Sequence, residues 1–223
     1  MSSNFFEKLF KFGTKGFNTI EYWKERGKKY GERAVLNLAY SPEKMDEVTV
    51  KQRNIIFPLI KKYLSGTERK ILDFGCGPGR FTKELSLLIG GSGIGIDPVE
   101  DFITIARERD PVNQYLVVDD YAIPFADNYF DVIWICLVMG GISTSNLKKI
   151  ENEITRVAKF DALLILIENT TVQQDHEHWY YRPVDFYENL FAKFNLVLEG
   201  EYEEFEETVS IMIGKKNYAN ISY

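Results

Sequence analysis

Three glycines at alternate positions, Gly75, Gly77 and Gly79, directly follow the apolar segment 70–74. Glycines at this spacing let the backbone turn tightly and let a ligand approach the main chain closely. The spacing departs from two common nucleotide-binding loops. A dinucleotide fingerprint needs glycine or alanine where Arg80 stands, and a phosphate-binding loop ends in Gly-Lys-Ser or Gly-Lys-Thr, which is absent. The loop therefore predicts a ligand site of another kind.

Carboxylates accompany this loop at the ends of three apolar segments. Asp73 precedes the first loop glycine by two residues, Asp97 ends the next apolar segment, and Asp119 ends the third. A carboxylate only accepts hydrogen bonds and can accept two at once, which suits paired hydroxyl groups. A bracing role in the loop remains open for Asp73, and a helix N-cap before Pro98 remains open for Asp97.

A second polar group follows the apolar segment 163–167. Glu168 ends that segment, and the two histidines of the chain, His176 and His178, lie in the polar loop beyond it. Carboxylates and imidazoles can take a proton from a nucleophile, so these three are the candidate catalytic residues. The loop favours substrate recognition, with a plain surface loop as the alternative. Because partner ligands for a His-x-His pair are not evident, no metal site is predicted.

Strands and helices alternate along the chain and must position these residues. Apolar runs predict five strands, and apolar residues at helical spacing predict helices between them. The predicted strands are 70–74, 93–96, 115–118, 131–137 and 163–167, followed by a closing pair at 196–202 and 208–213. This order predicts an α/β fold: a doubly wound, mostly parallel seven-stranded sheet with helices on both faces and the last strand antiparallel. Ligands of such folds bind at the carboxyl edge of the strands.

The first 50 residues differ in composition from the rest. Residues 1–33 contain eight basic and four acidic side chains, whereas the whole chain of 223 residues has a net charge of −6. We expect residues 1–50 to form an N-terminal helical arm or lid, starting with a short helix around 5–10, and residues 51–223 to form the ligand-binding domain. A helix resting on an anionic surface and an arm packed on its own domain remain alternatives.

Composition excludes several classes of protein. With 45% hydrophobic and 14% aromatic residues, the chain can form a sizeable core, and its negative charge argues against DNA as a partner. The two cysteines, Cys76 and Cys136, predict neither a disulfide scaffold nor a metal site and favour a cytoplasmic protein. No run approaches the ~20 apolar residues of a membrane span, so we expect no integral membrane association.

The pattern Asp-x-Gly-x-Gly-x-Gly after a strand resembles the first motif of the S-adenosylmethionine-dependent methyltransferases of the seven-stranded, Rossmann-like class. The resemblance covers roughly residues 50–170. Asp97 lies 18 residues beyond Gly79, where this family has a carboxylate. Residues 118–125 are similar to the family's Gly-Asp-Ala-x-x-Leu-Pro-Phe segment, and residues 127–131 to its lead-in to the fourth strand. With the loop, the two acids and these segments at the family's spacing, the sequence resembles the small-molecule methyltransferases.

The resemblance implies S-adenosyl-L-methionine as the cofactor. In the family, the residue at Asp73 meets the cofactor's ammonium group, the one at Asp97 accepts from both ribose hydroxyls, and the one at Asp119 contacts the adenine amino group. Asp120 is the alternative at the adenine position and offers its backbone amide to the ring. The other implied cofactor-binding positions are Gly75, Cys76, Gly77, Pro98, Tyr121, Ile135, Cys136 and, in the arm, Tyr22 and Trp23.

Two local departures set the chain apart from this family. Gly140 and Gly141 stand where the family often has histidines. Phe160-Asp161-Ala162 stands in place of the usual Pro-Gly-Gly, and we expect Asp161 to adopt the left-handed conformation of a glycine.

The resemblance implies methyl transfer to an oxygen or nitrogen atom of a small polar acceptor, with a sugar or sugar nucleotide as one candidate. Because a sulfonium is a good leaving group, the protein mainly has to align the reactants. A base is needed only where the acceptor atom carries a proton. A protein or RNA methyltransferase and a non-catalytic cofactor-binding protein are the alternatives. The sequence leaves the oligomeric state open.

Overall fold

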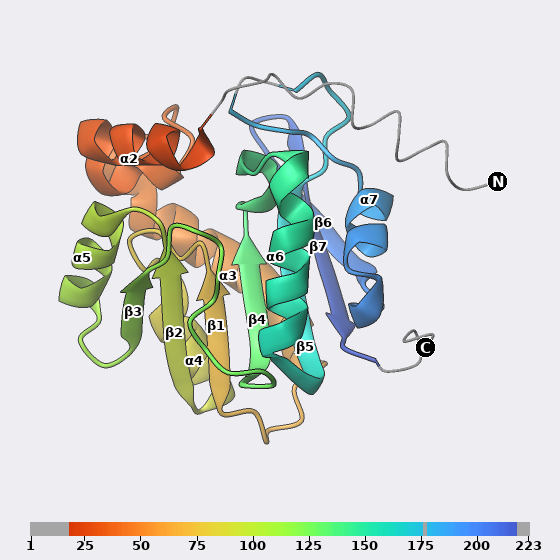
Figure 1. The fold of residues 1–223 in the computed structure, drawn as a ribbon. Helices are drawn as coiled ribbons and strands as arrows, with labels where there is room; N and C mark the ends of the chain where they lie inside the picture. Colours follow the sequence, from red (N-terminus) through yellow and green to blue (C-terminus); the bar gives the residue numbers. More distant parts are fainter. Residues whose placement is uncertain (1–17, 176–177, 218–223) are drawn as a thin grey trace.

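A computed structural model describes residues 18–175 and 178–217 and shows a central sheet with helices around it (Figure 1). The helix predicted around residues 5–10 and the candidate catalytic residue His176 lie outside the described residues. The sheet has seven strands in the order β3-β2-β1-β4-β5-β7-β6.

The five predicted parallel strands and the closing pair are all present. The strands are β1 (Lys70–Phe74), β2 (Ser92–Asp97), β3 (Gln114–Val117), β4 (Phe130–Cys136), β5 (Ala158–Asn169), β6 (Val197–Glu204) and β7 (Glu207–Lys215). The first five pair in parallel, and β7 runs antiparallel to both of its neighbours. The predicted mostly parallel sheet with an antiparallel last strand is therefore confirmed. Asp161 has the expected positive φ, 65°.

Helices cover both faces of the sheet, as predicted. They are α2 (Thr19–Tyr30), α3 (Met45–Lys61), α4 (Thr82–Ile89), α5 (Glu100–Arg109), α6 (Thr144–Val157) and α7 (Val184–Leu190). Short 3₁₀ turns are η1 (Gly31–Val35), η2 (Pro42–Lys44), η3 (Met139–Gly141) and η4 (Ala192–Phe194). The expected arm of residues 1–50 ends inside α3, which begins at Met45.

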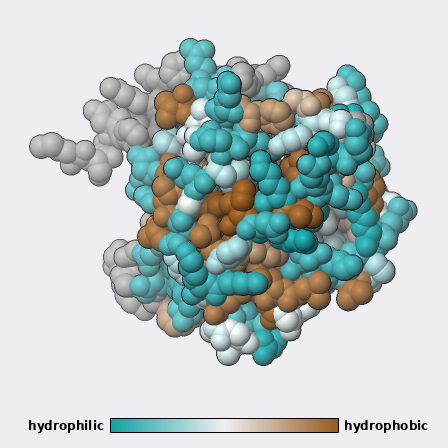
Figure 2. Space-filling view, turned by 180° about the vertical axis from the view of Figure 1, so that it is seen from behind, coloured by the Kyte–Doolittle hydropathy of each residue, from teal (hydrophilic) through white to brown (hydrophobic). Residues whose placement is uncertain are grey.

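The core divides into two layers because successive strand residues point to opposite faces. Ile133 and Ile135 of β4 pack with α6 and α7, whereas Val132 and Trp134 pack with α3 and α4. Figure 2 shows the molecule from behind, where hydrophobic residues lie among hydrophilic ones in the middle of the face. The two core layers bury both faces of β4, which explains its continuous run of apolar residues.

The helix α2 and the turn η1 lie over the end of the sheet toward which the parallel strands point (Figure 1). They pack against α5, where Ala34, Val99 and Phe102 form a small cluster with Trp23 at its edge. Gly27 permits this close packing, since a Cβ on it would lie 3.1 Å from Val99 Cγ1. The described part of the arm therefore covers the carboxyl edge, where ligands bind in such folds.

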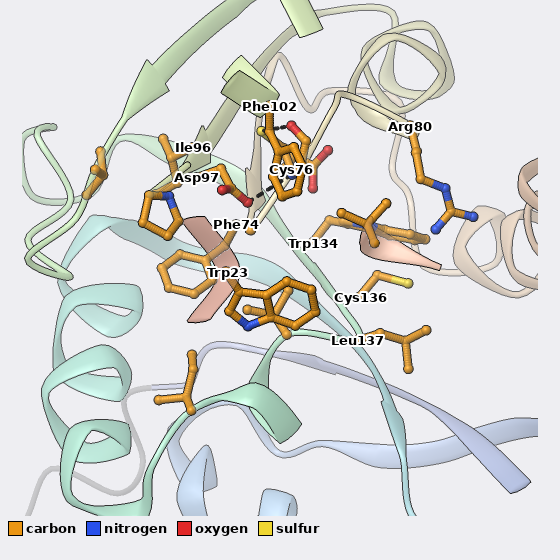
Figure 3. A pocket seen from close by; sticks show the side chains of 18 of the residues that line it. Trp23, Phe74, Cys76, Arg80, Ile96, Asp97, Phe102, Trp134, Cys136 and Leu137 are labelled. Carbon is orange, nitrogen blue, oxygen red and sulfur yellow. Dashed lines mark hydrogen bonds between the residues drawn. The ribbon is translucent and has the colours of Figure 1, made fainter. Parts of the chain in front are cut away.

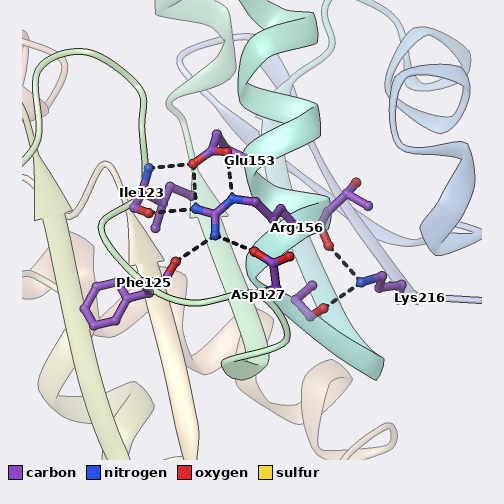
Figure 4. A network of polar contacts seen from close by, with 8 residues as sticks. Ile123, Phe125, Asp127, Glu153, Arg156 and Lys216 are labelled. Atoms are coloured by element: carbon purple, nitrogen blue, oxygen red, sulfur yellow. Dashed lines mark hydrogen bonds and ion pairs between the residues drawn. The ribbon is translucent and has the colours of Figure 1, made fainter.

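Arg156 of α6 holds the loop between β3 and β4 against this helix through hydrogen bonds (Figure 4). Its guanidinium donates to the carbonyl oxygens of Ile123 and Phe125, at 2.8 and 2.7 Å, and to the carboxylates of Glu153 and Asp127. Glu153 in turn accepts from the amide of Ile123 at 2.8 Å. The loop that carries the third predicted acid is therefore held in place from α6.

Candidate active site

A cavity lies at the carboxyl ends of β1, β2 and β4, beneath α2 (Figure 3). Asp97, Trp23 and Trp134 converge on it from three different elements. Predicted cofactor-binding residues that line it are Asp73, Gly75, Cys76, Gly77, Asp97, Pro98, Tyr121, Cys136 and Trp23. The structure therefore brings most of the predicted site residues together.

The glycine loop after β1 has the left-handed backbone that the sequence pattern predicts. Gly75, Gly77 and Gly79 have φ values of 74°, 52° and 75°, which residues other than glycine rarely adopt. A Cβ on Gly75 would lie only 2.5 Å from a methyl group of Val138. The amide of Gly75 donates to the carbonyl oxygen of Ile96 at 2.8 Å, which ties the loop to the end of β2.

Asp73 and Asp97 are both buried and reach the cavity wall. Asp73 Oδ2 accepts a hydrogen bond from Thr82 Oγ1 at 2.6 Å. Asp97 accepts from the amide of Gly77 at 3.0 Å and from that of Val99 at 2.9 Å. The bracing role considered for Asp73 therefore coexists with a place at the cavity. The hydrogen bond from the amide of Val99 to Asp97 lies at the start of α5. The N-cap residue of α5 is Val99 itself, not Asp97.

Burial controls the ionisation of these two carboxyls. It raises the pKa of Asp73 to about 7, and the nearby charge of Asp97 acts in the same direction. It also raises the pKa of Asp97 to about 6, against the effect of its two amide hydrogen bonds. Because desolvation disfavours the charged form, a bound cation and hydroxyl donors would stabilise both ionised carboxylates.

Asp119 and Asp120 lie outside the cavity wall. The Asp119 side chain is 63% exposed, with Oδ2 4.0 Å from Lys24 Nζ of α2. Asp120 is also exposed, and its Oδ1 accepts from the amide of Ala122 at 3.0 Å. Their neighbours Val118 and Tyr121 do line the cavity, and Tyr121 has a φ of 63°. Both carboxylates thus lie beside the cavity, on its solvent side.

Several wall residues were not predicted from the sequence. Phe102 of α5 and Trp134 of β4 line the cavity, as does Arg80 directly after the glycine loop. The arm and the segment after β4 add Thr19, Ile20, Val35, Leu137, Val138 and Ile142. Apolar residues of this kind match the pattern of core residues, so the sequence does not distinguish a cavity wall from packed interior. Only Arg80 carries a signal, as a charged residue placed against the glycine loop.

Glu168 has a position that does not suit its predicted catalytic role. It is fully buried and absent from both cavity walls. Its Oε1 accepts from the amides of Val138 and Met139 at 2.8 and 2.7 Å, and its Oε2 accepts from that of Gly140 at 3.3 Å. Burial raises its pKa to about 7. The carboxylate therefore holds the turn after β4, because that turn folds back over the end of β5.

The two glycines after β4 make room for two tryptophans. A Cβ on Gly140 would lie 2.3 Å from Trp179 Cε2, and one on Gly141 would lie 3.1 Å from Trp23 Nε1. These contacts account for the departure from the family at this point. Both tryptophans reach a second cavity, which adjoins the first.

This second cavity holds one of the residues predicted for catalysis, His178, and two of those predicted for the arm, Tyr22 and Trp23. Its wall includes His178 and Tyr22, whose rings stack with centroids 4.6 Å apart. Tyr22 therefore lines the second cavity and not the first. Trp23, Val35 and Leu137 line both cavities. The other buried prediction, Ile135, lies in the core, where its side chain packs with α6.

The two cysteines are free thiols, and burial raises the pKa of both. Both therefore stay protonated at neutral pH and are poor nucleophiles. Across residues 18–175 and 178–217, no group of three or more His, Cys, Asp or Glu side chains is placed to hold a metal ion. None of the described helices is long and apolar enough to cross a membrane.

Comparison with known sequences places residues 72–166 in a protein family described as a methyltransferase domain. Malonyl-[acyl-carrier protein] O-methyltransferase of Legionella pneumophila is 32% identical over 108 residues, 47% of this chain and 37% of that protein. Demethylmenaquinone methyltransferase of Lactococcus lactis is 31% identical over 139 residues, 57% of this chain and 54% of that protein. The chain thus spans about half or less of the length of these curated relatives.

Solved structures share the fold at low sequence identity. A protein of Pyrococcus horikoshii has a TM-score of 0.65 at 20% identity, covering 91% of this chain and all of that one. A methyltransferase of Methanosarcina mazei has a TM-score of 0.61 at 21% identity, covering 71% of this chain and 97% of that one. Residues 72–166 thus match a methyltransferase domain, and the seven-stranded sheet with a cavity at its carboxyl edge has the fold of a solved S-adenosylmethionine-dependent methyltransferase.

Proposed function

We propose that this chain transfers a methyl group from S-adenosylmethionine to an oxygen or nitrogen atom of a small polar acceptor. The observation that carries the proposal is the pair of adjoining cavities. The first has the glycine loop and two buried carboxylates, and the second has polar and aromatic walls. Because Trp23, Val35 and Leu137 line both, molecules in the two cavities would meet at these side chains.

The first cavity has the chemistry that this cofactor requires. Two buried carboxylates, Asp73 and Asp97, suit a cation that also carries hydroxyl groups. Apolar walls that include Phe102 and Ile96 suit a flat, weakly polar ring. When bound, S-adenosylmethionine supplies a methyl group on a sulfonium sulfur; the methyl carbon bonds to the acceptor atom while the carbon–sulfur bond breaks and its electron pair stays on sulfur.

The proposed roles of individual residues follow from their positions. Asp97 would accept from the ribose hydroxyls while keeping its bonds to two backbone amides, since a carboxylate has about four acceptor sites. Asp73 would face the ammonium group. Asp119 remains the proposed contact of the adenine amino group, and it would have to turn from the solvent side to reach it. Trp23 of α2 would exclude water from the space between the cavities.

His178 is the proposed base for acceptors that enter with a proton on the reacting atom. It lines the second cavity and stacks on Tyr22 of the arm. Imidazole side chains commonly act as general bases in enzymes. The buried Glu168 is not proposed for this role, since backbone amides occupy both of its oxygens.

Turnover on a panel of acceptors tests the proposed function. The full chain is incubated with S-adenosylmethionine and sugars, sugar nucleotides, carboxylic acids, phenols or amines, and release of S-adenosylhomocysteine is measured. We expect release with at least one class, and we expect His178→Asn to lower kcat at least about tenfold with unchanged affinity for S-adenosylhomocysteine. Cofactor binding without release on any class would contradict catalysis, and an unchanged kcat in the variant would remove the base role.

A further inference from the structure

The second cavity lies between the arm and the hairpin of β6 and β7. Its wall includes Tyr22, Trp23 and Arg26 of α2, His178 and Trp179 of the loop after β5, and Glu207 of the hairpin. Two features of this wall bear on what it binds: its carboxylates and its aromatic rings.

The carboxylate of Glu207 is held by neutral donors. It accepts from Asn169 Nδ2 at 2.7 Å, from Gln173 Nε2 at 2.9 Å and from the hydroxyl of Tyr181 at 3.0 Å. Glu204 likewise accepts from Gln52 Nε2 at 3.1 Å. None of the ion pairs among the described residues includes either carboxylate. Both negative charges are thus oriented without a salt bridge.

The arginine of this wall, Arg26, donates its hydrogen bonds to groups other than the two carboxylates. Arg26 donates from Nε to the carbonyl oxygen of Ala34 at 2.8 Å, from Nη1 to the hydroxyl of Tyr22 at 3.1 Å and from Nη2 to the carbonyl oxygen of Leu36 at 3.4 Å. The lining residues include one cation and two carboxylates, and the charge of Arg80 behind the wall acts on Glu204. Glu207 is therefore the carboxylate that would attract a positive ligand and repel a negative one.

Aromatic rings supply the rest of the cavity's character. Trp179, Tyr181 and Phe205 line it. Tyr22 and Trp23 line it too, but the Arg26 guanidinium already lies over their rings, 6.0 and 5.7 Å from the centroids. The face of an aromatic ring attracts a cation, and this attraction grows when the site excludes water. Rings together with carboxylates that lack a salt bridge are the combination that binds ammonium groups.

We infer that the acceptor bound in the second cavity is a small amine that enters as a cation, with Glu207 as its principal anionic partner. This inference rests on the proposed function and narrows it from oxygen or nitrogen to nitrogen. It sets the chain apart from the malonyl-[acyl-carrier protein] methyltransferases that it resembles, whose named acceptor carries a carboxyl group.

The transfer is balanced by the loss of one proton. The ammonium group first gives a proton to a base, for which His178 lines the same cavity. The freed lone pair then forms the nitrogen–carbon bond as the carbon–sulfur bond breaks, and its electron pair stays on sulfur. The methylated product carries the positive charge on nitrogen. Substrate and product are both cations, so the same carboxylates and rings hold each of them.

Three probes of one shape test the inference on the full chain saturated with S-adenosylhomocysteine. Choline carries a quaternary ammonium, 3,3-dimethylbutan-1-ol replaces it with a neutral carbon, and 3,3-dimethylbutanoate carries a negative charge. Binding is followed by tryptophan fluorescence, since Trp23 and Trp179 line the cavity. We expect choline to bind about tenfold more tightly than the neutral alcohol, and the carboxylate to bind most weakly.

A pair of glutamate variants locates the effect. Glu207→Gln removes the proposed anionic partner, and Glu206→Gln removes the same charge from an exposed neighbour that does not line the cavity. We expect the first to weaken choline binding about tenfold, because the attraction between opposite charges is lost, with affinity for the neutral alcohol unchanged. We expect the second to leave both affinities unchanged. Equal binding of choline and the alcohol by the wild type, tightest binding of the carboxylate, or equal losses in the two variants would overturn the inference.

Calorimetry with S-adenosylhomocysteine separates this failure from that of the proposed function. If the cofactor product binds but choline shows no advantage, the amine inference alone is wrong. If the product does not bind, the proposed function fails and the inference falls with it. The wild-type comparison needs no variant, so a misfolded Glu207→Gln protein would not block the test.

Discussion

At the scale of single residues, the central feature is a pair of buried carboxyls that face one cavity. Asp73 and Asp97 are 3% and 9% exposed, and no ion pair among the described residues includes them. Desolvation raises the pKa of each above its ordinary value. Ionising a carboxyl group at such a buried position is costly in the free protein, and a cationic ligand with hydroxyl groups offsets that cost.

Cofactor affinity is therefore expected to depend on pH. The ionised fraction of an acid rises with pH, so at pH 5.5 only about a quarter of a group with a pKa near 6 is charged, and less of one with a pKa near 7. Affinity for S-adenosylmethionine, measured by calorimetry, should be at least about tenfold higher at pH 8 than at pH 5.5. Asp73→Asn should flatten this dependence. A wild-type affinity that is constant or falls over this range would contradict the ionised pair.

At the scale of elements, the turn after β4 shows how the fold builds the cavity wall. Glu168 accepts from amides on one side of the turn, and Arg182 donates to the carbonyl oxygens of Met139 and Ile142 on the other, both at 2.8 Å. These bonds hold η3 between Val138 and Ile142, which both line the first cavity. The turn is thus fixed by two buried charged residues, neither of which lines that cavity.

Glu168→Gln should therefore affect stability and cofactor binding together. The amide nitrogen of glutamine cannot accept from a backbone amide, so at least one buried donor loses its partner. We expect the free energy of unfolding to fall by about 1–3 kcal/mol in urea denaturation, with weaker cofactor affinity. Glu206→Gln, on the surface, is the matched control. Unchanged stability and affinity in the Glu168 variant would show that the turn does not depend on this carboxylate.

The elements also show what sequence reasoning can and cannot reach. β1 matches its predicted bounds because five strand residues are followed directly by the glycine loop. β5 extends beyond the predicted 163–167, since the polar residues Lys159 and Asp161 lie at its exposed start. Glu168 ends a strand at the ligand edge, so its position alone suggests catalysis. Its amide partners come from the turn after β4, which no local pattern reveals.

At the scale of the whole molecule, the arm joins the two cavities. Trp23 of α2 and Val35 of η1 line both, and Lys24 of the basic arm lies 4.0 Å from Asp119. Residues 1–33 carry a net charge of +4 within a chain of net −6. Part of that contrast is explained by an arm that lies over an acidic edge. The predicted lid role remains a proposal, which the contacts of α2 support.

Hydrogen exchange tests whether the arm closes over the cofactor. If α2 contributes to the bound state, amides of 20–30 should exchange at least about tenfold more slowly in the presence of S-adenosylhomocysteine, because ligand binding suppresses local opening. Amides of α7, which lines neither cavity, are the internal control and should change little. Protection confined to the glycine loop and β2, with α2 unchanged, would show that the arm is not a lid.

Calorimetry with S-adenosylhomocysteine, comparing the wild type with Asp97→Asn, tests most directly whether the cavity beneath α2 holds the cofactor through buried carboxylates. The exposed Asp101→Asn on α5 is the matched control. We expect one molecule bound per wild-type and control chain, and about a hundredfold weaker binding in Asp97→Asn, because two hydrogen bonds to a charged acceptor are lost. No binding to the wild type, or equal affinities in all three proteins, would contradict this assignment of the cavity.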